Sequence, residues 1–181
     1  MIRLFVALAL PDAIRTELSF LSGALRGARW IDPVSYHLTL RFIGEVDERV
    51  AEEIDLALAR VRAPAFELTL QGVGQFGDHS AHALWAGVAG NEALAHLAAK
   101  VDSALRQAGQ PGDGRRFTPH VTLARLRNVP VERVMEYLSA HALFRSAPFL
   151  VSAFTLFSSH QGRGGAHYVA EAEYPLSPLR Q

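Results

Sequence analysis

The 181-residue sequence contains no cysteine. Disulfide bonds, thiolate nucleophiles and zinc sites built on cysteine are therefore excluded. The lack of cysteine also fits a protein of a reducing compartment, and we expect a cytoplasmic location. Any catalytic chemistry in this chain must come from side chains other than thiols.

The sequence also lacks a surplus of positive charge. Eighteen Lys and Arg residues balance 18 Asp and Glu residues, so the formal net charge is zero. Proteins that wrap long nucleic acids usually carry a basic excess, because neutralising phosphates supplies most of the affinity. A role with nucleic acid would therefore involve a short stretch or a chain end, held by a local cluster of arginines.

No hydrophobic run approaches the roughly 20 apolar residues that span a membrane. The apolar stretch at residues 4–10 follows Arg3 as in a signal peptide, but it is short and Pro11 ends it. We interpret this stretch as a buried strand. With 49% hydrophobic and 20% charged residues, the chain is typical of a soluble globular protein, and we expect one domain over residues 1–181.

Hydrophobic periodicity predicts strands that alternate with helices. Strands are expected at residues 2–10, 36–43, 66–70, 83–88, 119–125, 148–157 and 166–174. Helices are expected at 12–25, 47–61, 91–109 and from 130, and loops at 74–82, 110–116 and 158–165. The order in the second half repeats that in the first. This repeat predicts an α+β fold of two pseudo-symmetric lobes around a central cleft, each an antiparallel sheet with helices on its outer face.

Two tetrapeptides share the pattern His, apolar, Thr, apolar: HLTL at 37–40 and HVTL at 120–123. With only eight histidines and six threonines in the chain, two such matches are improbable by chance. Both lie in predicted strands, where successive side chains point to opposite faces. The histidine and threonine of each copy therefore share one face, while the apolar residues pack under the helices. If the two polar faces meet, two imidazoles and two hydroxyls converge in one cleft.

This set of side chains suits chemistry at a phosphodiester. Histidine titrates near neutral pH, so His37 and His120 can act as acid and base in an in-line displacement at phosphorus. The hydroxyls of Thr39 and Thr122 can donate to the phosphate oxygens that carry charge in the transition state. No metal and no cofactor are expected, because neither motif has a third ligand at suitable spacing. A histidine satisfied in the core would explain one copy, but the repetition favours catalysis.

The sequence resembles the RNA 2′,3′-cyclic phosphodiesterase family, also called bacterial 2′-5′ RNA ligases, within the two-histidine phosphoesterase superfamily. Besides the paired motifs, the resemblance rests on RLFVALALP at 3–11, HLTLRFIGEV at 37–46, LWAG at 84–87 and PHVTLAR at 119–125. It implies a bilobal fold and hydrolysis of the cyclic end to a 2′-phosphomonoester, with weak reversible 2′-5′ ligation. It also implies that His37 is the acid toward the 3′ oxygen and that His120 helps the attacking water.

Two further residues are candidates for substrate binding. Arg125 matches a family arginine that contacts the phosphate, but strand alternation places it away from His120 unless the strand ends or bulges. Phe42 can stack on a base. In a regular strand Phe42 shares a face with Leu38 and Leu40, so packing in the core is the favoured interpretation.

We expect the partner to be RNA with a 2′,3′-cyclic phosphate end, such as a tRNA fragment or a short oligonucleotide, and we expect a monomer with no membrane contact. Two alternatives remain open: a phosphodiesterase for small cyclic or 2′-5′-linked nucleotides, and a non-catalytic module that binds RNA ends. The basic pair Arg115 and Arg116 either contacts an RNA backbone or lies in a solvated loop.

Overall fold

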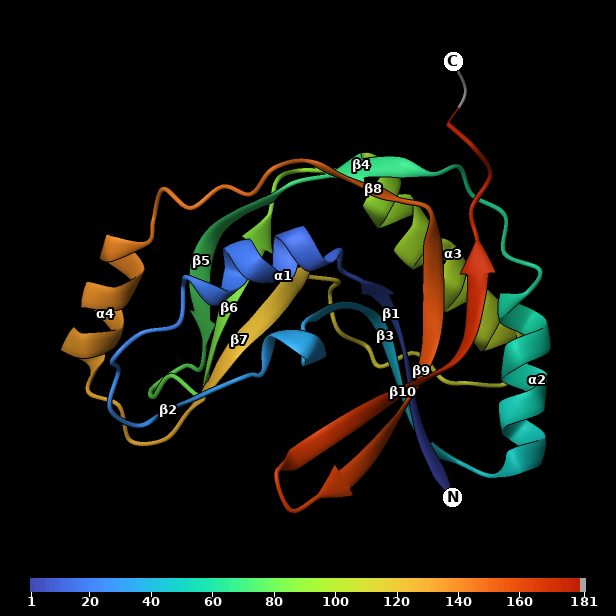
Figure 1. Cartoon of the computed structure of the whole chain (residues 1–181). Helices are drawn as coiled ribbons and strands as arrows, with labels where there is room; N and C mark the ends of the chain where they lie inside the picture. The colour runs from blue at the N-terminus through green and yellow to red at the C-terminus, as the bar shows by residue number, and fades with distance from the viewer. Residues whose placement is uncertain (180–181) are drawn as a thin grey trace.

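The computed structural model describes residues 1–179, which form a mixed α+β fold (Figure 1). Its helices are α1 (Asp12–Ser19), α2 (Glu48–Leu58), α3 (Glu92–Gln107) and α4 (Val131–Ala140), with a short 3-10 helix η1 (Pro33–Ser35). Its strands are β1 (Ile2–Ala9), β2 (Ala28–Trp30), β3 (His37–Val46), β4 (Phe66–Leu68), β5 (Leu70–Phe76), β6 (Ala83–Val88), β7 (His120–Leu126), β8 (Phe149–Val151), β9 (Ala153–Gly162) and β10 (Gly165–Pro175).

The strands form one large antiparallel sheet and one small sheet. The large sheet runs in the order β10-β9-β1-β3-β7-β6-β5, with β2 paired to β7 off this path, and the small sheet pairs β4 with β8. The two halves of the large sheet meet between β3 and β7, where Leu38 pairs with Val121. The strands that carry the two His-Thr motifs are therefore neighbours at the centre of the sheet.

The helices divide between the two halves of the sheet (Figure 1). On one half, α3 contacts α2 and β3, and the hydroxyl of Tyr174 in β10 donates to Asp55 of α2. On the other half, Tyr137 of α4 clusters with Leu84 of β6 and donates from its hydroxyl to the carbonyl of Leu21, just after α1. The predicted α+β class, with helices covering antiparallel strands, is confirmed.

The helices α2 and α3 begin where the sequence predicts because each has a capping side chain. Asp47 accepts a hydrogen bond from the backbone N–H of Val50, and Asn91 accepts one from that of Leu94, both at 2.9 Å. These bonds satisfy N–H groups that have no partner within the helix. The first helix is shorter than predicted: α1 ends at Ser19, although the apolar spacing continues to residue 25.

Two predicted strands are each divided in the structure. The segment 148–157 contains β8 and the start of β9, and Ser152 separates them so that β8 pairs with β4 while β9 pairs with β1. The segment 66–70 likewise contains β4 and the first residue of β5. A continuous hydrophobic run does not reveal such a change of partner, because both pieces are buried on one side.

Two predicted loops begin as strand. Within 74–82, β5 continues to Phe76, and within 158–165, β9 continues to Gly162 before the chain turns. The hairpin of β9 and β10 projects away from the body of the sheet in Figure 1. Its main-chain pairing continues where the side chains are exposed, so hydrophobic periodicity does not detect it.

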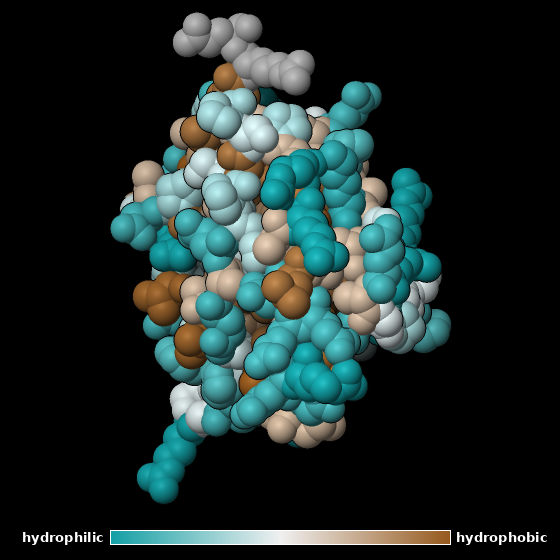
Figure 2. Space-filling view, turned by 90° about the vertical axis from the view of Figure 1, so that its right-hand side faces the viewer, coloured by the Kyte–Doolittle hydropathy of each residue, from teal (hydrophilic) through white to brown (hydrophobic). Residues whose placement is uncertain are grey.

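The face of the molecule that includes α2 is mainly hydrophilic, with hydrophobic side chains scattered over it (Figure 2). Single exposed apolar side chains of this kind are ordinary on protein surfaces. Across residues 1–179, the helices are too short or too polar to cross a membrane.

Candidate active site

A cleft of about 1830 Å³ lies over the junction between the two halves of the large sheet. Side chains of β3, β7, α3, the β9–β10 hairpin and the loop before β7 line it. Its charged lining residues are six arginines and three aspartates: Arg3, Arg41, Arg106, Arg115, Arg116, Arg125, Asp78, Asp102 and Asp113. Positive charge therefore predominates in the cleft although the whole chain is neutral.

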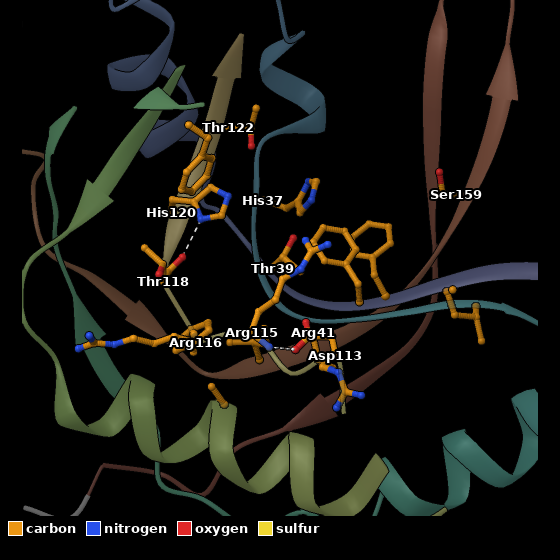
Figure 3. Close-up of a pocket in the computed structure, with 18 of the residues that line it drawn as sticks. His37, Thr39, Arg41, Asp113, Arg115, Arg116, Thr118, His120, Thr122 and Ser159 are labelled. Carbon is orange, nitrogen blue, oxygen red and sulfur yellow. Dashed lines mark hydrogen bonds between the residues drawn. The ribbon is translucent and has the colours of Figure 1, made fainter. Parts of the chain in front are cut away.

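The two motif histidines face each other across this cleft (Figure 3). Nδ1 of His37 lies 2.8 Å from the carbonyl oxygen of Ser35, and Nδ1 of His120 lies 2.7 Å from that of Thr118. A carbonyl oxygen only accepts hydrogen bonds, so Nδ1 of each ring carries a proton. This fixes the tautomer and leaves both Nε2 atoms to exchange protons with a ligand.

Aromatic rings pack against both histidines. The ring centroid of His37 lies 4.9 Å from that of Phe5 and 5.0 Å from that of Tyr168, which meets it edge-on. The ring of Phe76 meets that of His120 edge-on, with 4.7 Å between the ring centroids, and the ring centroid of Trp85 lies 6.3 Å from that of His120. These contacts restrict rotation of the imidazoles and exclude water from one side of each ring.

Burial lowers the pKa of both histidines. For His37, the positive charges of His120 and Arg125 lower the pKa further, while the hydrogen bond to Ser35 opposes the shift. For His120, Arg125 again adds to the effect of burial, and the hydrogen bond to Thr118 opposes it. Both rings are therefore mainly neutral at pH 7 in the free protein, and an anion bound between them would favour protonation.

The motif threonines lie in the same cleft as the histidines. Thr39 and Thr122 are both half-buried and line the cleft (Figure 3). The residue between the histidine and the threonine in each sequence motif, Leu38 or Val121, is fully buried on the opposite face of the strand. Strand alternation thus places the side chains as the motif predicts, and the structure brings all four polar motif residues together.

Both motif strands break this alternation at equivalent positions. In β3, Leu40 and Arg41 are both buried, and in β7, Leu123 and Ala124 are both buried. The pairing registers shift at the same places, so that Leu40 and Leu123 are extra residues without a partner on the next strand. Each is a β-bulge, which turns the following side chains to the other face.

The bulges place both further candidates on the cleft. Arg125 is exposed, lines the cleft and acts on both histidines through its charge, so the bulge that its role requires is present. Phe42 is 59% exposed and also lines the cleft. The favoured interpretation of Phe42 as a core residue is therefore wrong, because it assumed unbroken alternation after Leu40.

Sequence patterns do not reveal several other residues of the cleft. Phe76 falls in a segment predicted as loop, and Tyr168 comes from the far end of the chain, so no spacing links either residue to a histidine. Arg41 is buried under the cleft only because of the bulge. Arg115 and Arg116, for which the sequence left two interpretations, both line the cleft.

Among residues 1–179, no group of three or more His, Asp or Glu side chains is arranged to hold a metal ion. Each motif histidine has a threonine rather than a carboxylate beside it, and threonine is a poor ligand for zinc. That the reaction needs no metal remains a prediction.

Two strands that each carry a histidine and a threonine meet in a basic cleft, and they belong to an antiparallel sheet covered by helices. This combination of site and fold defines a two-histidine phosphoesterase. The comparison with known families agrees and is more specific. Residues 10–163 match the family model of the 2′-5′ RNA ligase superfamily. The chain belongs to this family.

Relatives named RNA 2′,3′-cyclic phosphodiesterase are similar in sequence. The protein of Aeropyrum pernix is 39% identical over 105 residues, which cover 55% of this chain and 60% of the relative. That of Thermus thermophilus is 36% identical over 144 residues, which cover 73% of this chain and 72% of the relative. The chain thus spans about three fifths of the A. pernix relative.

A solved structure extends the similarity over almost the whole chain. Escherichia coli LigT in its apo form matches with a TM-score of 0.80 and 28% sequence identity. The match covers 97% of this chain and 98% of LigT. The architecture described above is therefore that of an established fold.

Proposed function

We propose that this protein hydrolyses the 2′,3′-cyclic phosphate at an RNA end to a 2′-phosphomonoester, with His37 and His120 as acid and base. The pair of histidines carries this proposal: both are fixed through Nδ1, and both face one basic cleft. The relatives named RNA 2′,3′-cyclic phosphodiesterase support this choice of substrate.

The proton transfers follow from the free Nε2 atoms. His120 removes a proton from water through Nε2 while the water oxygen bonds to phosphorus. The bond from phosphorus to the 3′ oxygen breaks, and protonated His37 gives its Nε2 proton to that oxygen. The reaction leaves a 2′-phosphate, a 3′-hydroxyl, neutral His37 and protonated His120, and proton exchange with solvent restores the starting state. The assignment of the acid and the base follows the family resemblance.

Arg125 and the two threonines bind the phosphate in this proposal. In the free protein, Arg125 helps to lower the pKa of both histidines. A bound phosphate anion offsets that positive charge and favours the protonated form of the acid. The hydroxyls of Thr39 and Thr122 donate to the non-bridging oxygens as charge develops there. Substrate binding thus favours protonation of His37, the proposed acid.

The exposed ring of Phe42 offers a surface on which the terminal base stacks. The substrate is a short oligonucleotide or a tRNA fragment, since the whole chain carries no net positive charge while arginines outnumber aspartates in the cleft. The same displacement, run with a ribose hydroxyl in place of water, gives weak 2′-5′ ligation. A monomeric state and a cytoplasmic location belong to the same proposal.

The test incubates the protein, in excess chelator, with a short RNA that ends in a 2′,3′-cyclic phosphate. We expect a 2′-phosphate, which phosphatase removes and which co-elutes in chromatography with a synthetic 2′-phosphate standard and not with the 3′-phosphate isomer. The same RNA ending in a 3′-phosphate is the control and should stay unchanged. Binding without turnover would support the RNA-end-binding module. Turnover of cyclic mononucleotides alone would support the small-nucleotide enzyme, and activity that requires a divalent ion would contradict metal-independent catalysis.

A further inference from the structure

Arg41 is a buried cation that the proposed reaction does not use. Arg41 is only 6% exposed, because the bulge at Leu40 turns its side chain beneath the cleft. Its guanidinium donates to the carboxylate of Asp102 on α3 and to the carbonyl oxygen of Pro111, in the loop that follows α3. One side chain thus joins the strand of His37, a helix and a loop.

A second arginine holds the same loop. Nε of Arg106 donates to the other carboxylate oxygen of Asp102 at 2.7 Å. The guanidinium of Arg106 covers Gly112 so closely that a Cβ at Gly112 would collide with it. We call Arg41, Asp102 and Arg106 the loop clamp, because they hold residues 111 and 112 from two sides.

The clamped loop carries the basic pair of the cleft. Residues 111–117 are in neither helix nor strand, and Arg115 and Arg116 both line the cleft. Asp113 accepts a hydrogen bond from the backbone N–H of Arg115 at 3.0 Å, which shapes the turn. Figure 3 shows Arg115 extending on the side of the histidines and Arg116 extending away from them. Within residues 1–179, neither arginine forms an ion pair.

Part of the cleft wall contributed by α3 is made of small side chains. Ala95, Ala98 and Ala99 line it together with the clamp residues. A groove with a smooth wall on one side and unpaired guanidinium groups on the other suits a sugar–phosphate chain, whose phosphates are the main source of affinity. A cyclic mononucleotide, which has no further phosphate, would not reach both parts.

We propose that the loop clamp is a positioning device, in which Arg41 and Asp102 hold the loop so that Arg115 and Arg116 contact backbone phosphates on the 5′ side of the cyclic end. This inference rests on the proposed function. In this pair Arg41 is buried and Asp102 is partly buried. Ion pairs removed from water add little stability against apolar residues of similar volume, so the pair fits a role in fixing the loop. Arg41 acts through the loop and does not touch the reacting atoms.

The test compares Arg41→Met with wild type on two substrates: a short RNA with a 2′,3′-cyclic end and adenosine 2′,3′-cyclic monophosphate. We expect KM for the RNA to rise roughly tenfold, as for one lost charge-assisted contact, with kcat and the mononucleotide parameters unchanged. Arg49→Met is the matched control, because Arg49 forms an exposed pair with Glu53 on α2. Thermal melting shows whether each variant is folded.

Two more variants guard against a folding defect. Arg41→Lys keeps the charge but lacks the forked donors that serve Asp102 and Pro111 together, so KM for the RNA should rise in the same direction. Replacing Arg115 and Arg116 together by alanine should raise it as well, and Arg41→Met should add little to that change. A folded Arg41→Lys protein with unchanged KM for RNA would overturn the proposal. Equal losses on both substrates would do the same.

Equilibrium binding separates this inference from the proposed function. The titration uses a short labelled RNA that ends in a 2′-phosphate, followed by fluorescence anisotropy. Wild type that turns over neither substrate would contradict the proposed function, and the titration alone would then decide the role of the clamp. A roughly tenfold weaker affinity of Arg41→Met would support it, and unchanged affinity would overturn it.

Discussion

At the scale of single residues, the two halves of the molecule use the same device to orient a histidine. In each half, Nδ1 donates to the carbonyl oxygen two residues earlier, at Ser35 and at Thr118. The ring nitrogen that remains, Nε2, is then available for proton transfer. The histidine and threonine of each motif were predictable from the sequence, whereas the carbonyl partners depend on the turn before each strand.

The threonines should matter less than the histidines. Replacing Thr39 or Thr122 by valine removes one donor to the phosphate while the proton transfers remain, so we expect single-turnover rates to fall roughly 10- to 100-fold. Serine at either position keeps the hydroxyl and should retain a rate close to that of wild type. A valine variant as active as the serine variant would remove that threonine from phosphate binding.

Arg125 should set the pH dependence of the reaction. With one base and one acid, kcat/KM should follow a bell-shaped curve, and both lowered histidine pKa values place its limbs below the usual histidine value of 6.5. Arg125→Gln removes a positive charge that lowers both pKa values, so both limbs should move to higher pH. Arg127→Gln, outside the cleft, is the control. Unmoved limbs in a folded Arg125→Gln protein would contradict this electrostatic role.

At the scale of elements, the bulges explain where prediction from sequence succeeds and where it fails. Up to Thr39 and Thr122, strict alternation gives the correct face for every motif residue. Beyond them, one extra leucine in each strand reverses the faces, which exposes Phe42 and brings Arg125 into the cleft. A bulge changes the hydrogen-bond register without a marked change in residue type, so the sequence alone does not locate it.

The pairing of β5 with β6 supports His120 through a contact of glycine with tryptophan. Gly74 pairs with Trp85, and a Cβ at Gly74 would collide with the indole ring. We expect Gly74→Ala to lower the free energy of unfolding by about 1–3 kcal/mol, as overpacking does, and to reduce activity by displacing Trp85 from behind His120. Denaturant unfolding and turnover would measure both effects.

Gly23→Ala is the matched control for this change, because nothing lies within 4 Å of a Cβ at Gly23. It should unfold and react like wild type. If Gly74→Ala proved as stable and as active as Gly23→Ala, the packing of Trp85 would not be what supports His120.

At the scale of the whole molecule, a neutral chain has a local excess of positive charge in one cleft. Neutral net charge predicts weak affinity for the interior of an RNA and a shallow dependence of binding on salt. Titrations of long RNA with and without a cyclic end, at several salt concentrations, would measure both. Tight, strongly salt-dependent binding to RNA without a cyclic end would favour the binding-module alternative. That residues 1–181 form one domain with an internal repeat remains a prediction.

The proposed catalysis requires the two histidines to act as a unit. Single-turnover rates of His37→Ala, His120→Ala and the double variant test this directly. We expect each single substitution to slow cleavage of the cyclic end by about 10²–10⁴-fold. The double variant should be only slightly slower, because the concerted path is already lost. All three should melt close to wild type, since the side chains face a cleft. A folded single variant with a near wild-type rate, or losses that multiply in the double variant, would contradict the account.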